Sequence, residues 1–162
     1  MNKEVEMRNQ ADLFKEMRGQ LTSTQAIKEF ALAGNATITV RSKSTDRRFT
    51  FKIRKPRKLR NPNQPIWFVS LLTGCDNENH YQYFGEILSN NTFRHGQRAD
   101  LSKDAVGVLA FTWFWNTIQA NREDLLELAA VWHEGKCGRC GRKLTVPESI
   151  ESGFGPECIN FV

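Results

Sequence analysis

The last thirty residues contain three of the four cysteines in the chain, and this segment constrains the fold more than any other. Cys137 and Cys140 form a Cys-x-x-Cys motif with a glycine after each cysteine, and seventeen residues separate Cys140 from Cys158. The glycines allow a tight turn to present two thiolates to one tetrahedral ion. His133, four residues before Cys137, completes a Cys3His set, which is typical of a closed structural zinc site. The pattern predicts one zinc ion that folds the tail and leaves no open position for chemistry.

The sequence leaves alternatives open for these residues. A redox Cys-x-x-Cys would begin a helix after a strand and would leave Cys158 without a role. Disulfides need an oxidising compartment, and the N-terminal MNKEVEMRNQ has no apolar signal region. Cys75 is an alternative fourth ligand if the middle of the chain folds back onto the tail. The alternative for His133 is a packed histidine at a helix end.

Two runs in the tail resemble a known group of proteins. Residues 137–150 read CGRCGRKLTVPESI, and residues 153–158 read GFGPEC. These runs resemble a small cysteine-bearing domain of uncharacterised phage, prophage and plasmid proteins. The resemblance implies a mobile-element origin and zinc binding by four residues, His133, Cys137, Cys140 and Cys158. It implies no activity, so the function has to be argued from other parts of the chain.

The charge of the chain is concentrated in one segment. The 162 residues carry a net charge of +5, but residues 41–60 alone contain ten Lys and Arg against one Asp, a local charge of +9. The length suits one domain with its own core plus the metal-binding tail. No apolar run approaches the roughly 18 residues of a membrane helix. We therefore expect no membrane partner and a location in the cytoplasm of a bacterial host.

The hydrophobic pattern divides the chain into N-terminal helices over residues 1–35, an α+β core over 36–132 and a zinc-binding tail over 133–162. Apolar residues recur at helical spacing over residues 3–18. Thr22 and Gln25 have the spacing of a capping box, which predicts a second helix that ends near Gly34.

Residues 36–88 alternate with the period of strands, and they predict an antiparallel β-meander of about four strands. The hairpin in this segment places Phe49, Phe51 and Ile53 on one face and basic residues on the other. Residues 66–72 form a continuous apolar run, which is typical of a central strand.

The pattern then returns to helical spacing. A helix over residues 103–120, capped by Ser102, is expected to pack across the sheet, and a short helix from Arg122 leads toward His133. The predicted fold is therefore α+β, an antiparallel meander packed by helices with a zinc-knuckle tail.

The basic hairpin face and the loop that follows it carry the functional prediction. Cations that share a face repel one another and are stabilised beside a polyanion, where phosphates replace their counterions. Two tyrosines on a neighbouring strand are placed to stack on unpaired bases of a single strand. The predicted nucleic-acid-binding residues are Arg48, Lys52, Arg54, Lys55, Arg57, Lys58, Arg60, Tyr81 and Tyr83. The alternative is a solvated edge strand whose charge prevents aggregation.

The sequence contains no motif that supports catalysis. It has no G-x-S-x-G, no P-loop and no paired-carboxylate motif, and its three histidines are far apart in the chain. We therefore expect a non-enzymatic, nucleic-acid-binding accessory protein of a phage or mobile element, with a structural zinc site. The alternative is a phage-encoded inhibitor that uses its basic face to bind an acidic surface on a host defence protein.

Overall fold

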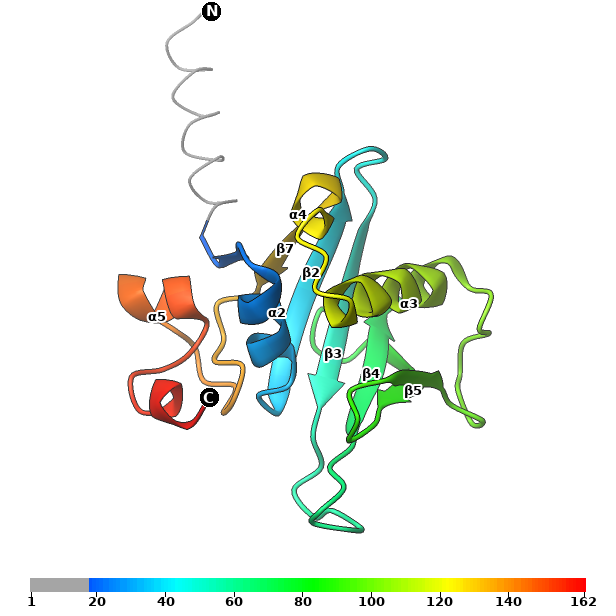
Figure 1. Cartoon of the computed structure of the whole chain (residues 1–162), viewed down its shortest axis with the longest axis horizontal. Helices are drawn as coiled ribbons and strands as arrows, with labels where there is room; N and C mark the ends of the chain where they lie inside the picture. The colour runs from blue at the N-terminus through cyan, green and yellow to red at the C-terminus, as the bar shows by residue number, and fades with distance from the viewer. Residues whose placement is uncertain (1–17) are drawn as a thin grey trace, which may run out of the picture.

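The alternating residues of the middle of the chain form five consecutive strands of an antiparallel sheet (Figure 1). The computed structural model describes residues 18–162. The five strands are β2 (Asn35–Ser42), β3 (Arg48–Arg54), β4 (Trp67–Leu72), β5 (Tyr81–Ile87) and β6 (Phe93–His95). Each strand pairs with the next along the chain, so the predicted meander is confirmed.

Two further strands extend the sheet beyond β2. β7 (Ala129–His133) pairs with β2, and β1 (Gln20–Leu21) pairs with β7, which gives the strand order β1-β7-β2-β3-β4-β5-β6. The class α+β and the antiparallel pairing are therefore confirmed, but the sheet has seven strands and the predicted number of about four is wrong.

The undercount has a physical cause in each strand that was missed. β1 and β6 contain two and three residues, too few to show a period. The segment before His133 has leucines at helical spacing, but the helix α4 (Leu125–Leu128) is only one turn long. The chain then becomes extended because the free edge of β2 supplies hydrogen-bond partners, which no local pattern reveals.

The helices begin slightly later than predicted. In α2 (Thr24–Ala31) the N-cap is Ser23, whose hydroxyl accepts a hydrogen bond from the Ala26 N–H. The long helix α3 (Val106–Gln119) starts after Ala105 and not after Ser102. The helix expected over residues 3–18 lies outside the described residues, apart from residue 18. Within residues 18–162, no helix has the length and the apolar composition of a membrane-spanning segment.

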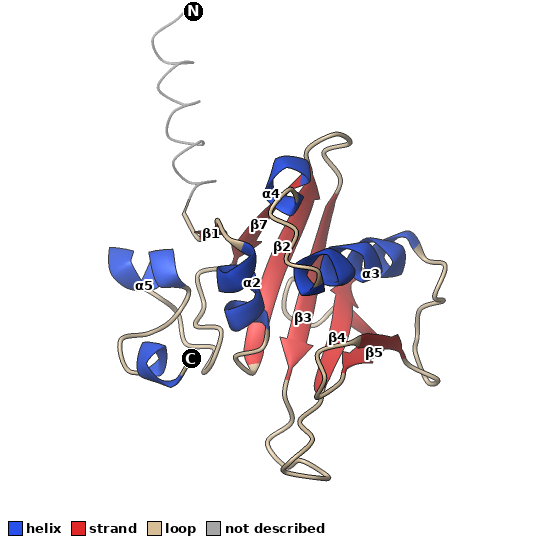
Figure 2. Cartoon of the chain, in the orientation of Figure 1, coloured by secondary structure: helices blue, strands red, loops and turns tan. Residues whose placement is uncertain are grey.

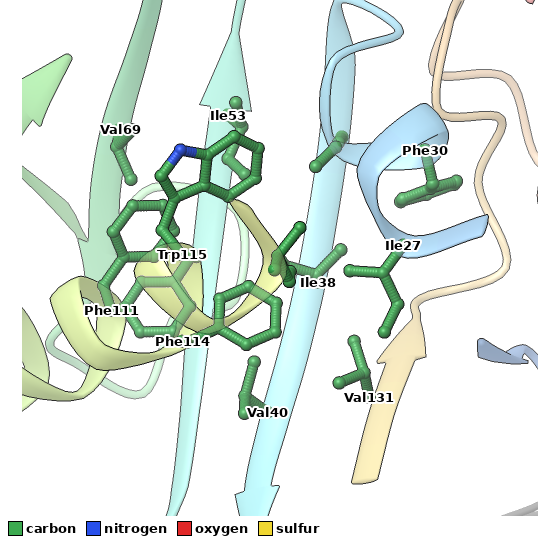
Figure 3. Packing of buried hydrophobic residues seen from close by; sticks show 14 of the residues in the cluster. Ile27, Phe30, Ile38, Val40, Ile53, Val69, Phe111, Phe114, Trp115 and Val131 are labelled. Atoms are coloured by element: carbon green, nitrogen blue, oxygen red, sulfur yellow. The ribbon is translucent and has the colours of Figure 1, made fainter. Parts of the chain in front are cut away.

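The core lies between α3 and the sheet. Phe111 of α3 is fully buried, and its ring centroid lies 4.9 Å from that of Phe51 and 5.0 Å from that of Phe93. Gly107 faces Leu71 so closely that a Cβ at this position would collide with the leucine side chain. Figure 3 shows the aromatic side chains of α3 directed at the apolar residues of β2, β3 and β4.

The tail folds beside α2, at the side of the sheet where β1 and β7 lie (Figure 1). It contains α5 (Pro147–Ser152) and the short 3-10 helix η1 (Cys158–Phe161). The backbone N–H of Asn35, at the start of β2, donates to the carbonyl of Gly138 at 2.8 Å. Phe30 of α2 packs on Phe154, with 5.7 Å between ring centroids. Backbone and side-chain contacts therefore both attach the tail to the core.

Replacing Phe111 by alanine should lower the free energy of unfolding by about 3–5 kcal/mol, because it removes a buried ring and leaves a cavity. Leu109→Ala is the matched control on the same helix, since Leu109 is 52% exposed and its truncation should cost less than about 0.5 kcal/mol. Urea denaturation followed by far-UV circular dichroism measures both. Similar destabilisation of the two variants would contradict this description of the core.

Candidate functional site

The three cysteines of the tail converge on one point. The Sγ atoms of Cys137, Cys140 and Cys158 all lie within 4.8 Å of one another. In a tetrahedral zinc site with Zn–S bonds of about 2.3 Å, the sulfurs are roughly 3.8 Å apart, so a small inward shift would bring all three into contact with one ion. The cluster could therefore hold a metal ion, as the spacing of the cysteines predicts.

The loop between the first two cysteines closes as a knuckle. The Cys137 N–H donates to the Arg142 carbonyl at 2.8 Å, and the Gly141 N–H donates to the Cys137 carbonyl at 2.8 Å. Gly141 has a φ of 78°, in the left-handed region that favours glycine. The predicted role of a glycine in this turn is confirmed at Gly141.

Backbone amides surround the first sulfur. Burial alone would raise the pKa of the Cys137 thiol, but backbone N–H groups of Cys140, Gly155 and Arg139 outweigh burial and lower this pKa to about 7. The Gly155 N–H lies 3.5 Å from the Cys137 sulfur. These donors favour the thiolate, which is the form of cysteine that binds metals.

His133 does not join the cluster. Its Nε2 lies 2.5 Å from the Ile150 carbonyl oxygen, and its Nδ1 accepts a hydrogen bond from the Gly135 N–H at 2.9 Å. Its ring stacks on Phe30 with 5.4 Å between centroids. Burial lowers the pKa of His133, which favours a neutral ring with the proton on Nε2. Both ring nitrogens are therefore engaged by the backbone, so the structure does not assemble the predicted Cys3His set.

Cys75 does not supply the fourth ligand either. It is exposed between β4 and β5, and it is not part of the three-cysteine group. Within residues 18–162, no other His, Cys, Asp or Glu completes this group. A hollow of about 350 Å³ is lined by the three clustered cysteines and also by Leu144 and Glu157. If the three cysteines held a metal ion, water or another ligand in this hollow could complete a set of four ligands.

The second candidate site is the sheet face opposite the helices, which we call the open face. Helices α2, α3 and α4 lie together on the other face (Figure 2). Directly paired residues of antiparallel strands point to the same side of a sheet. Pairing places Arg54, Phe68, Glu86 and Arg94 in one row across β3, β4, β5 and β6. Phe68 in this row is 41% exposed.

A neighbouring row on the open face contains Lys52, Ser70 and Tyr83. The Lys52 ammonium lies 4.1 Å from the centroid of the Tyr81 ring and donates to the Glu78 carbonyl at 2.7 Å. Burial is the main cause that raises the pKa of Tyr81, to about 12. The Lys52 ammonium thus lies over the ring of Tyr81. The half-buried Tyr83 instead contacts the exposed Phe68, with 6.0 Å between ring centroids.

Not all of the predicted basic residues are equivalent. The Arg54 guanidinium donates to the Ala36 carbonyl at 2.8 Å and to the Thr37 hydroxyl at 3.3 Å, and burial lowers its pKa. Arg54 is thus engaged in the sheet itself. Lys55 is directed elsewhere, because its ammonium lies 5.7 Å from the centroid of the buried Trp67 ring.

The remaining predicted cations are accessible. Arg48 is exposed at the start of β3, and its guanidinium lies 5.9 Å from the centroid of the Trp132 ring. Arg57, Lys58 and Arg60 are exposed in the loop between β3 and β4. The predicted basic residues therefore lie on the open face and in this loop, except for Lys55, which lies on a different side.

Sequence reasoning missed several residues of the open face. A hollow of about 800 Å³ lies where β4, β5 and β6 meet the loops on either side. Its lining includes Arg60, Phe68, Tyr83, Glu86, Arg94 and Arg98. Phe68 lies in an apolar run that predicts a central strand with both faces covered. Because side chains alternate along a strand, Phe68 points to the face opposite that of its buried neighbours Trp67 and Val69.

Comparison with known proteins finds similarity in the C-terminal part of the chain. Residues 129–159 match the model of a family of unknown function (DUF6011). This segment runs from the start of β7 through all three clustered cysteines. No curated protein and no solved structure matches the chain. The similarity therefore concerns β7 and the tail and carries no activity.

Substituting any one of Cys137, Cys140 and Cys158 by serine should remove bound metal, because two thiolates rarely retain an ion that three hold. Metal content per protein, measured by elemental analysis after purification, tests this expectation. Cys75→Ser is the matched control and should keep the metal.

His133→Asn should also keep the metal while lowering the melting temperature, because His133 bonds to backbone groups and packs on Phe30. A His133→Asn protein without metal would instead make His133 a ligand.

Proposed function

We propose that this protein is a nucleic-acid-binding accessory protein of a phage or mobile element, and that it binds a single strand along the open face. The observation that carries the proposal is the sharing of this face by cations and aromatic rings, among them Lys52, Phe68, Tyr83 and Arg94. Single-strand sites combine a basic surface that follows the backbone with rings on which bases stack. The mobile-element origin rests on the resemblance of the tail.

The distribution of charge supports a polyanionic partner. Lys52 has a lowered pKa, caused by burial first and then by the nearby positive charge of Arg54. The loop residues Arg57, Lys58 and Arg60 add three exposed cations beside the face. A bound phosphate backbone would relieve the repulsion among these groups and release its own counterions.

The metal ion has a supporting role in this proposal. We infer that Cys137, Cys140 and Cys158 hold one zinc ion, which would stabilise a tail with few buried apolar residues of its own. Zinc matches thiolate ligands and needs no redox chemistry. The tail also carries exposed cations of its own, such as Lys143.

Binding of a labelled single-stranded oligonucleotide across a salt series tests the proposal. The double variant Lys52→Ala/Lys58→Ala should bind more weakly, because fewer phosphates of the strand are neutralised. The negative slope of log K against log salt should become shallower by roughly 0.7 for each phosphate that the variant no longer neutralises. Fluorescence anisotropy at several salt concentrations measures both quantities.

Lys28→Ala/Lys103→Ala is the matched control, because it removes the same charge from α2 and from the segment before α3. This control should leave affinity and salt slope close to those of the wild type. Equal weakening in both variants would indicate a general charge effect and contradict a site on the open face. If the wild type binds no oligonucleotide at low salt, the proposal fails, and an inhibitor that binds an acidic host protein becomes the function to test.

A further inference from the structure

The hollow at the end of the open face has the composition of a nucleotide site. Its volume of about 800 Å³ lies in the range of roughly 300–1,000 Å³ that is usual for small-molecule sites. Three arginines reach it from separate segments: Arg60 from the loop after β3, Arg94 from β6 and Arg98 from the loop after β6. Arg60 is far from Arg94 and Arg98 in the chain, and it meets them because β4, β5 and β6 are neighbours in the sheet.

Two aromatic rings line the same hollow. Phe68 and Tyr83 lie 6.0 Å apart between centroids with an angle of 71° between their planes. Phe68 is 41% exposed, so part of its ring is accessible from solvent. An exposed ring beside arginines offers a surface on which a base can stack.

Glu86 positions the polar groups of the hollow. Its carboxylate accepts a hydrogen bond from the Tyr83 hydroxyl at 3.3 Å and forms an ion pair with Arg94 at 3.3 Å. These bonds hold the tyrosine ring and one guanidinium in place before any ligand binds. Arg60 and Arg98 are exposed, and the excess of three arginines over one glutamate leaves the hollow positive.

The geometry points to a site for one nucleotide of the bound strand, with its base against Phe68 and Tyr83 and its phosphates beside Arg60 and Arg98. This inference rests on the proposed function and makes it specific, because it assigns base contact to one place on the open face. Phe68 is the stacking residue, and Glu86 is a positioning residue.

A pair of probes with equal charge separates stacking from electrostatics. We would measure, at fixed salt, the affinity of a deoxythymidine strand of about twelve nucleotides and of an abasic strand of the same length. The wild type should prefer the strand with bases by about 5- to 150-fold, which is the range that one stacked base provides. Phe68→Leu should lose most of this preference and keep its affinity for the abasic strand. Arg98→Ala should weaken binding of both strands and make the negative slope of log K against log salt shallower by roughly 0.7.

Trp113→Leu is the matched control, because Trp113 is also 41% exposed but belongs to α3 on the helix-covered face. It should retain the preference of the wild type. If wild-type protein binds both strands equally and with a steep salt dependence, the nucleotide site is wrong, but binding of the strand's phosphates by the open face remains supported. Equal effects of Phe68→Leu and Trp113→Leu would also overturn the site. If neither strand binds at low salt, both the site and the proposed function are wrong.

Discussion

The pairing of β7 with β2 is the interaction on which the rest of the structure depends. It sets Val131 opposite Val40 and His133 opposite Ile38, so the chain leaves β7 near the start of β2. From there Gly138 soon reaches β2, where its carbonyl accepts a hydrogen bond from the Asn35 N–H, and Phe154, later in the tail, packs on the ring of Phe30. The same pairing provides the edge to which β1 adds. The segment that matches a family of unknown function begins with this strand and contains all three clustered cysteines.

The sheet serves two purposes because each strand has two faces. In β3, Phe51 and Ile53 are buried under the helices, and the alternate residues Lys52 and Arg54 lie on the open face. The aromatic packing around Phe111 keeps the strands in register and so fixes the spacing of the cations on the opposite side. A stable core is therefore also the support for the surface that we propose as the binding site.

Local patterns were sufficient for part of the fold and part of the site. The β3 hairpin, the long helix α3 and the Cys137–Cys140 knuckle each follow from residues that are close in sequence. The approach of Cys158 to the knuckle was predicted from residue type and spacing, because three thiolates can bind one metal ion. In contrast, β7 could not be separated from a helix, because its extended conformation depends on hydrogen bonds to the edge of β2. Side-chain partners were equally hidden: backbone groups of Gly135 and Ile150 occupy the two nitrogens of His133, although its spacing suits a ligand.

The sequence by itself determined the α+β class, the meander, the basic segment and the three-cysteine cluster, because hydrophobic period, charge and thiol chemistry are properties of neighbouring residues. Only the tertiary structure decided the seven-stranded order, the packed role of His133 and the hollow between Arg60, Phe68 and Arg98. These features depend on which distant segments become neighbours, and that choice is made by burial and hydrogen bonding over the whole chain at once.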